Sequence, residues 1–241
     1  MAERVTPTQP VQSVKVPEPP EVLYKYLPPE RIDIVENMEL RFSRPSEFND
    51  TFDTHYLVPR SQGAKASTAR AVLRNQLGIF CLTERPNDHL MWVHYARNHT
   101  GFVLGFDAKA SFFRENGRIL DRVVYRKGPK VFGDADVKVC FYKSDTWEHE
   151  REWRCVRSFP SSEPRAVGIE PGLITQIILG SRMEAWQIAR IMLCKTAYEM
   201  NRTQFLLSVP SKKSWTFENR LKTMSFCDNC GGNGYLMKDQ T

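Results

Sequence analysis

A chain of 241 residues is long enough for one large domain or two small ones, and it can bury a core without a disulfide or a metal. A composition of 41% hydrophobic and 26% charged residues excludes collagen-like and wholly disordered classes. The net charge of +6 permits an anionic partner, such as a nucleotide or a nucleic acid. Four of the six cysteines are scattered singly, which indicates reduced thiols and a cytoplasmic location. No apolar run is long enough to span a membrane, so we expect no membrane partner.

Short strands and helices are predicted in turn along the chain. Residues 1–20 are rich in proline and indicate a flexible tail. Strands are expected at 22–26, 40–43, 78–83, 101–107, 118–126, 150–157, 173–179, 204–209 and 215–221. Helices are expected at 28–38, 67–76, 88–97 and 184–200. Strict strand–helix alternation is absent, which favours an α+β fold. We therefore predict a single domain at 21–223, with a mixed, largely antiparallel central sheet of short strands and flanking helices, and a separate tail at 224–241.

The first informative segment is Phe48-Asn49-Asp50-Thr51-Phe52-Asp53. Asn and Asp side chains bond to the nearby backbone in turns, and the two phenylalanines are expected to hold this loop against the core. The loop is either a structural turn or the lining of a pocket, where Asn49 and Asp50 would contact a ligand.

The second segment runs from Met91 to Gly101 and contains two of the chain's histidines, His94 and His99. His89, His94 and His99 are spaced five apart, so no two share a helix face and a zinc site of the i, i+4 kind is excluded. Trp92 and Tyr95 are expected to pack inward. His94 is either a hydrogen-bonded packing residue or a catalyst.

The third segment, WEHEREWRC, is read as a strand that carries Glu148, Glu150, Glu152 and Arg154 on one face. Neighbouring carboxylates repel one another unless a cation lies opposite. The face is either a charged solvent edge or the wall of a cleft, where a carboxylate stabilises a developing cation and Arg154 holds a neighbour in place. On the strand at 22–26, alternation places Lys25 opposite Tyr24 and Tyr26, so only one of these sets is expected to face the interior.

The order of the motifs LYKY, RFSRPSEFNDTFD, GIFCLTE, MWVHYARNHTGFVLGFD, WEHEREWR and ITQIILG resembles the DUF2971 family of bacterial and phage-associated proteins. The resemblance covers about residues 22–180. It implies no activity, because the family is named for having no assigned function.

A more distant similarity is to ADP-ribosyltransferase-like folds, which carry an aromatic or basic residue on an early strand, a Ser or Tyr in the middle and a late Glu-x-Glu pair. This resemblance implies a substrate site made by Tyr24, Lys25, Tyr26 and Ser43, with Tyr95 as an alternative to Ser43. It also implies catalysis by Glu150 and Glu152 on NAD. The departure from the pattern is the first strand, which has no clear His or Arg.

The last segment, Cys227-Asp228-Asn229-Cys230-Gly231-Gly232-Asn233-Gly234, fits CxxCxGxG and is similar to half of a zinc knuckle in DnaJ-type chaperones. Structural zinc needs four ligands, and the chain has no second CxxC. Cys227 and Cys230 therefore form a half-site for zinc, completed by a second chain in a homodimer or by a histidine, or they form a redox or idle dithiol.

Three functions remain open at this stage. The first is an NAD-using transferase or glycohydrolase, acting in phage–host conflict. The second is a non-enzymatic module that binds nucleic acid or a protein. The third is a nuclease in which Asp50, Asp53 and Glu150 hold a divalent ion.

Overall fold

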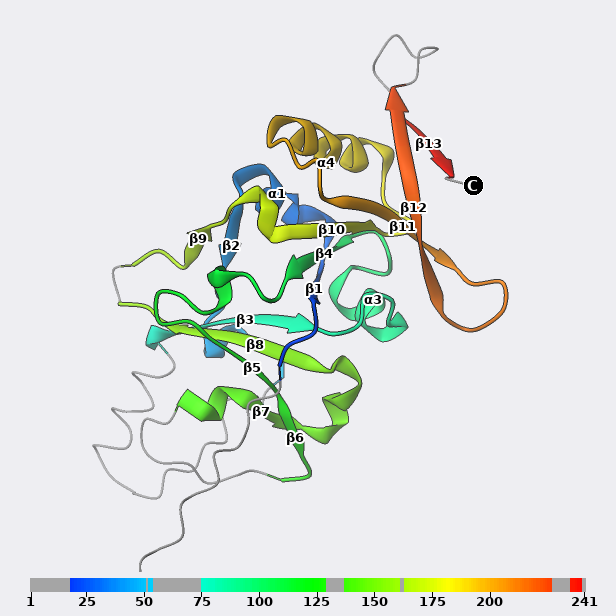
Figure 1. Cartoon of the computed structure of the whole chain (residues 1–241). Coiled ribbons are helices and arrows are strands. Elements are labelled where there is room, and N and C mark those ends of the chain that lie inside the picture. Colours follow the sequence, from blue (N-terminus) through cyan, green and yellow to red (C-terminus); the bar gives the residue numbers. More distant parts are fainter. Residues whose placement is uncertain are drawn as a thin grey trace, which may run out of the picture.

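A nine-stranded sheet organises the described part of the chain, residues 18–50, 52–53, 75–128, 137–160, 163–226 and 235–239 of a computed structural model (Figure 1). Its strand order is β13-β12-β11-β10-β4-β1-β3-β8-β5. The strands are β1 (Val22–Leu27), β3 (Leu77–Thr83), β4 (Phe102–Asp107), β5 (Ile119–Arg122), β8 (Glu152–Ser158), β10 (Ile174–Leu179), β11 (Gln204–Pro210), β12 (Phe217–Phe226) and β13 (Tyr235–Asp239). Within this sheet as described, only β10 and β11 pair in parallel, so the predicted α+β fold with a mixed, largely antiparallel sheet is confirmed.

Shorter elements flank this sheet. Two small sheets pair β2 (Glu39–Arg41) with β9 (Ala166–Gly168), and β6 (Val124–Arg126) with β7 (Tyr142–Ser144). The α-helices with described bounds are α1 (Asp33–Asn37), α3 (His89–Tyr95) and α4 (Ala185–Ala197), and none of the described helices is long and apolar enough to cross a membrane. The 3₁₀ turns are η1 (Pro29–Ile32), η2 (Pro45–Glu47), η3 (Ser111–Phe113), η4 (Val137–Phe141), η5 (Asp145–Glu150) and η6 (Pro171–Leu173).

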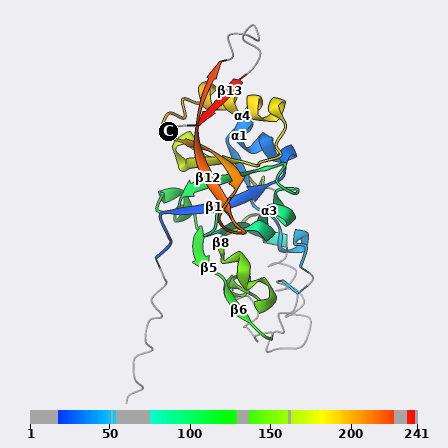
Figure 2. The ribbon, with the colours of Figure 1, turned by 90° about the vertical axis from the view of Figure 1, so that its right-hand side faces the viewer.

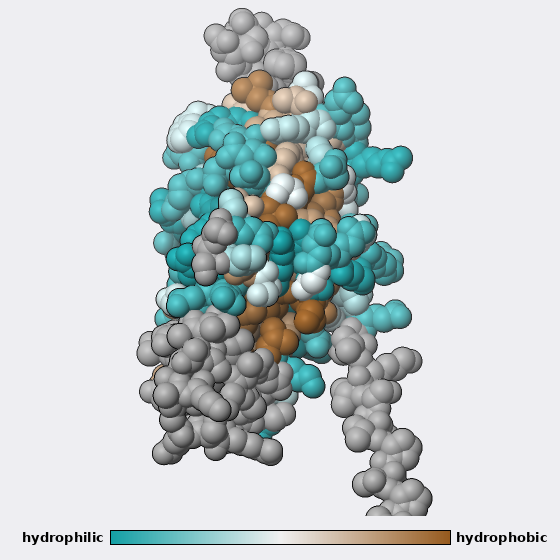
Figure 3. All heavy atoms as spheres, turned by 90° about the vertical axis from the view of Figure 1, so that its left-hand side faces the viewer, coloured by the Kyte–Doolittle hydropathy of each residue, from teal (hydrophilic) through white to brown (hydrophobic). Residues whose placement is uncertain are grey.

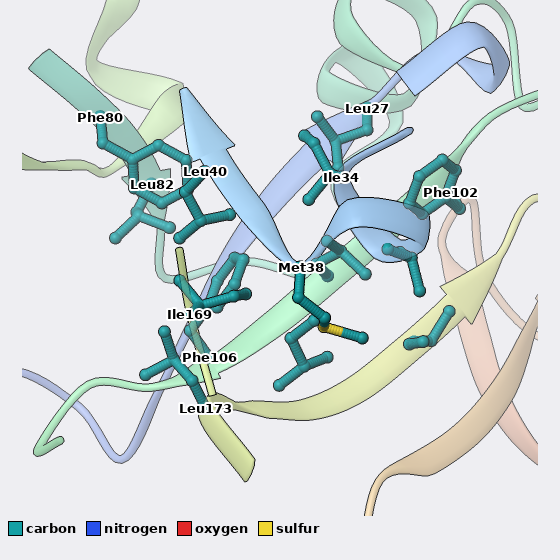
Figure 4. Close-up of a cluster of buried hydrophobic side chains, with 14 of the residues drawn as sticks. Leu27, Ile34, Met38, Leu40, Phe80, Leu82, Phe102, Phe106, Ile169 and Leu173 are labelled. Carbon is teal, nitrogen blue, oxygen red and sulfur yellow. The ribbon is translucent and has the colours of Figure 1, made fainter. Parts of the chain in front are cut away.

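The main core lies on one face of the sheet, under α1 and α4 (Figures 1 and 4). Alternate residues of β1, β3 and β8, such as Leu27, Phe80 and Trp153, point into it. The opposite face carries two smaller clusters, one under α3 around Trp92 and one under η4 around Ile79. Polar side chains therefore occupy the space between two separate apolar clusters on this second face.

The sheet is nearly divided between β1 and β3. β1 pairs with β4 at six positions, and β3 pairs with β8 at seven, but β1 and β3 are joined only at Tyr24 and Thr83. Further along the same edge of β3, Ile79 forms a bridge to Ser43. Cys81 lies between these two bridges, so its carbonyl oxygen is open to another donor.

Several expected elements differ in their bounds. The strand expected at 118–126 is two strands in different sheets, β5 and β6. The strand expected at 150–157 begins only at Glu152, because η5 ends at Glu150 and Arg151 adopts a left-handed conformation with φ of 45°. The helix expected at 67–76 lies almost wholly outside the described residues, as do Cys227 and Cys230, so the zinc half-site stays a prediction.

The C-terminal strands extend beyond the rest of the described fold (Figure 2). β11 and β12 form the expected antiparallel pair, and β12 continues past residue 224 to Phe226, where it pairs with β13. The domain boundaries proposed from the sequence stay a prediction. Apolar side chains gather in a central band on the face seen in Figure 3, between hydrophilic regions.

Candidate functional site

A pocket with a volume of about 280 Å³ opens on the second face of the sheet, beside the division between β1 and β3. This volume is at the lower end of the range for small-molecule sites, and it suits one ring and its sugar better than a whole dinucleotide. Its walls come from β1, β3, β7, β8, α3 and the loop that follows η2. The lining residues are Tyr24, Lys25, Tyr26, Ser43, Glu47, Phe48, Asn49, Asp53, Cys81, Leu82, Thr83, Met91, Tyr95, Lys143, Glu150, Glu152 and Arg154.

Most residues proposed from the sequence meet in this pocket. Of the catalytic candidates, Glu150, Glu152 and Tyr95 line it. Of the substrate-binding candidates, the pocket contains Tyr24, Lys25, Tyr26, Ser43, Asn49 and Arg154. His94 and Asp50 are not among the lining residues. His94 is exposed, and Asp50 is buried within the loop that follows η2.

Glu150 is held at the pocket from three directions. Its Oε1 accepts a hydrogen bond from the Tyr95 hydroxyl at 2.6 Å, and its Oε2 accepts one from the Lys143 ammonium at 2.5 Å. The Thr83 hydroxyl donates to its backbone carbonyl at 2.6 Å. The Glu150 side chain is only 4% exposed. A buried carboxylate with this many partners has a fixed position, which is what electrostatic stabilisation of a reacting cation requires.

Arg154 organises the acidic side chains deeper in the pocket. Its guanidinium makes two bonds to Asp53, at 2.9 and 2.5 Å, and two to Glu152, at 2.7 and 2.9 Å. It also donates to the carbonyl oxygen of Cys140 at 2.7 Å. Burial alone would raise the pKa of Glu152, but the attraction of Arg154 and Lys143 is larger and lowers this pKa to about 2. Arg154 therefore holds its neighbours in place, as the sequence suggested.

Lys143 is the cation that the sequence analysis missed. Its ammonium bridges Glu150 and Glu152, at 2.5 and 3.1 Å, and its side chain is 6% exposed. Burial opposes its charge, yet the two glutamates outweigh burial and raise its pKa. The row of carboxylates did signal that a cation must lie opposite them. Lys143 is in β7, within a segment whose secondary structure the periodicity left ambiguous.

Aromatic and apolar side chains form the rest of the wall. The Tyr26 hydroxyl donates to the carbonyl oxygen of Arg85 at 2.9 Å and accepts from the amide of Asp88, which caps α3. Tyr95 is half-buried on α3, and burial is the main cause that raises its pKa, so the phenol stays a hydrogen-bond donor. Asn49 opposes this effect and lowers the pKa of Tyr95 by a smaller amount.

Two local expectations are corrected. Phe48 packs against the cluster under η4, but Phe52 is 66% exposed and does not hold the loop to the core. The loop is instead fixed by the bonds from Asp53 to Arg154. Alternation also fails to decide which side of β1 faces the pocket, because Lys25 and both tyrosines line it. The division beside β1 opens the sheet to both of its faces.

The contacts of the acidic side chains can be compared with two hypotheses from the sequence, a charged solvent edge and a divalent-ion site. Glu150 and Glu152 do not face open solvent, as a purely charged sheet edge would require. Asp53 and Glu150, two of the three ligands proposed for a divalent ion, are paired with Arg154 and Lys143. Within the described residues, no three His, Cys, Asp or Glu side chains form a group that could hold a metal ion.

Comparison with known families identifies one segment of the chain, which covers most of α3 and the chain up to the middle of β8. Residues 91–155 match the DUF2971 family, described as a protein of unknown function. The resemblance inferred from the motifs is thus confirmed over this segment, which includes Tyr95, Lys143, Glu150, Glu152 and Arg154. No curated protein and no solved structure matches the chain significantly.

Proposed function

We propose that this DUF2971-containing protein is an enzyme that breaks the bond between nicotinamide and ribose in NAD, as an ADP-ribosyltransferase or a glycohydrolase. The observation that carries the proposal is the position of Glu150, a buried carboxylate held by Tyr95 and Lys143 in a pocket with aromatic walls. The distant resemblance to ADP-ribosyltransferase-like folds, based on Glu150 and Glu152, supports the same chemistry.

The chemistry requires a fixed negative charge beside the reacting carbon. When the C1′–N bond of NAD breaks, its electron pair leaves with nicotinamide, and the ribose gains oxocarbenium character. Glu150 would stabilise that positive charge, and its two protein partners would keep the carboxylate from moving away. Water or an acceptor group then bonds to C1′ and loses a proton, so that the products with water are ADP-ribose, nicotinamide and a proton.

The pocket walls suit one end of such a substrate. Tyr24, Tyr26, Tyr95 and Met91 offer surfaces for a planar ring. Because the pocket holds about 280 Å³, the nicotinamide riboside end and its adjoining phosphate would enter, and the adenosine end of the dinucleotide would extend outside. Glu152 is bonded to Arg154 and Lys143, so we assign it a positioning role and Glu150 the catalytic one.

The test is release of nicotinamide from NAD by purified protein, with and without a cell extract as the source of an acceptor. We expect release by the wild type and a loss of at least about a hundredfold in Glu150→Gln, a loss typical for removal of a preorganised electrostatic group. Glu39→Gln is the matched control, because Glu39 is an exposed carboxylate in β2. Absence of release by the wild type in every extract, or equal release by Glu150→Gln, would refute the proposal.

A further inference from the structure

Lys25 is a half-buried cation at the division in the sheet. Its ammonium donates to the carbonyl oxygen of Cys81 at 3.0 Å and lies 4.6 Å from the centre of the Phe80 ring. On β1 it belongs to the same face as Leu23 and Leu27, which are in the main core. Its ammonium nevertheless reaches the pocket, because β1 and β3 are not paired at this point.

The other two cations that line the pocket form ion pairs with carboxylates, whereas Lys25 does not. Lys143 is paired with Glu150 and Glu152, and Arg154 with Asp53 and Glu152. Among the described residues, no carboxylate forms an ion pair with Lys25. Burial is the main cause that lowers the pKa of its ammonium. A charge that is partly removed from water and has no counter-charge is costly, so a ligand that brings a negative group to this point gains binding energy.

We propose that Lys25 is the anion-recognition residue of the pocket, and that the natural ligand carries a phosphate group that bonds to its ammonium through the opening between β1 and β3. The ligand is then a nucleotide or another phosphate ester rather than an uncharged nucleoside. This inference deepens the proposed function, because it concerns the same pocket, but it makes a claim about binding that does not depend on cleavage of NAD.

The experiment compares ligands that differ by one phosphate, in proteins that differ by one charge. Binding of AMP, adenosine and inorganic pyrophosphate is measured by calorimetry for the wild type and for Lys25→Met. We expect the wild type to bind AMP about tenfold or more tightly than adenosine, as a hydrogen bond between charged groups allows. In Lys25→Met this difference disappears and adenosine binds as before. Lys109→Met, at an exposed lysine, is the control.

A second measurement needs no variant. A small amine-reactive reagent is added to the wild type, and labelling of each lysine is followed by mass spectrometry. Pyrophosphate is expected to slow labelling of Lys25 by about tenfold while leaving that of Lys109 unchanged, if an ion pair of this strength covers the amine. Binding of pyrophosphate without AMP would identify a free phosphate as the source of the anion.

The outcomes separate this inference from the proposed function. Phosphate-dependent binding through Lys25 without any release of nicotinamide would support the inference and refute the proposed reaction. Equal loss of AMP and adenosine binding in Lys25→Met would show a structural role and overturn the inference. Failure of the wild type to bind either AMP or pyrophosphate would also overturn the inference about Lys25. So would unchanged labelling of Lys25 in the presence of pyrophosphate, whatever the result with NAD.

Discussion

The Tyr95 hydroxyl and the Glu150 carboxylate lie 2.6 Å apart, although 55 positions separate them in the chain. Tyr95 is the last residue of α3, and Glu150 is the last residue of η5, so the bond connects the two halves of the pocket wall. The bond also determines which oxygen of Glu150 faces α3, since Lys143 takes the other.

Tyr95→Phe removes this hydroxyl and keeps the ring. Because a hydrogen bond to a charged group contributes about 1.5–3 kcal/mol, we expect nicotinamide release to fall by about ten- to a hundredfold. The control is Tyr198→Phe, whose hydroxyl donates to the carbonyl oxygen of Glu36 away from the pocket. That variant should keep the wild-type rate. A Tyr95→Phe enzyme with the wild-type rate would show that this bond has no part in catalysis.

Arg154→Met should be strongly destabilising. The substitution leaves the carboxylates of Asp53 and Glu152 buried without their main partner, and breaking a buried ion pair from one side costs about 3–5 kcal/mol. Arg41→Met removes an exposed pair with Glu47 and should cost less than about 1 kcal/mol. Urea unfolding measures both free energies. Equal losses in the two variants would mean that the buried network contributes nothing special to stability.

The sequence predicted much of this network but not its geometry. Short apolar runs identified β1, β3, β4 and β10, because a strand buried on both faces carries apolar residues at successive positions. The role of Arg154 followed from the need for a cation beside Glu150 and Glu152. Lys143 was missed, since its segment has no clear period and its contacts are set by how β6 and β7 pack.

The division between β1 and β3 could not be predicted either. Strand pairing depends on contacts far apart in sequence, and a pair that stops after one bridge leaves no local pattern. The sequence therefore placed Lys25 and Tyr26 on opposite sides of β1, which is correct for an unbroken sheet. The opening in the sheet brings both residues to one pocket.

The pH dependence of the unfolding free energy should report the ionisation of Glu152. Its pKa in the folded protein is about 2, below the ordinary value of 4.5. A lowered pKa stabilises the folded state above the unfolded value, and the contribution is lost as the pH falls toward 2. The difference amounts to about 3 kcal/mol. Unfolding free energies of the wild type and Glu152→Gln should therefore converge by this amount between pH 5 and about pH 2. A constant gap between them would contradict an ionised Glu152 in the folded protein.

Substitution of Gly101 by alanine tests the packing that positions α3 against β1. A Cβ atom added there would lie 2.0 Å from the carbonyl oxygen of Leu27 and 3.0 Å from Cα of Pro28, which are backbone atoms with little freedom to move. The Gly101 amide also donates to Ala96, just after α3, and its carbonyl oxygen accepts from Gly180, so the residue cannot shift alone. We expect Gly101→Ala to cost about 3 kcal/mol or more, as severe overpacking does, with a lower melting temperature. Gly168→Ala is the matched control, because a Cβ atom at Gly168 meets nothing within 4 Å. If both alanine variants melt at the wild-type temperature, the backbone of Leu27 does not approach Gly101 as closely as the structure places it.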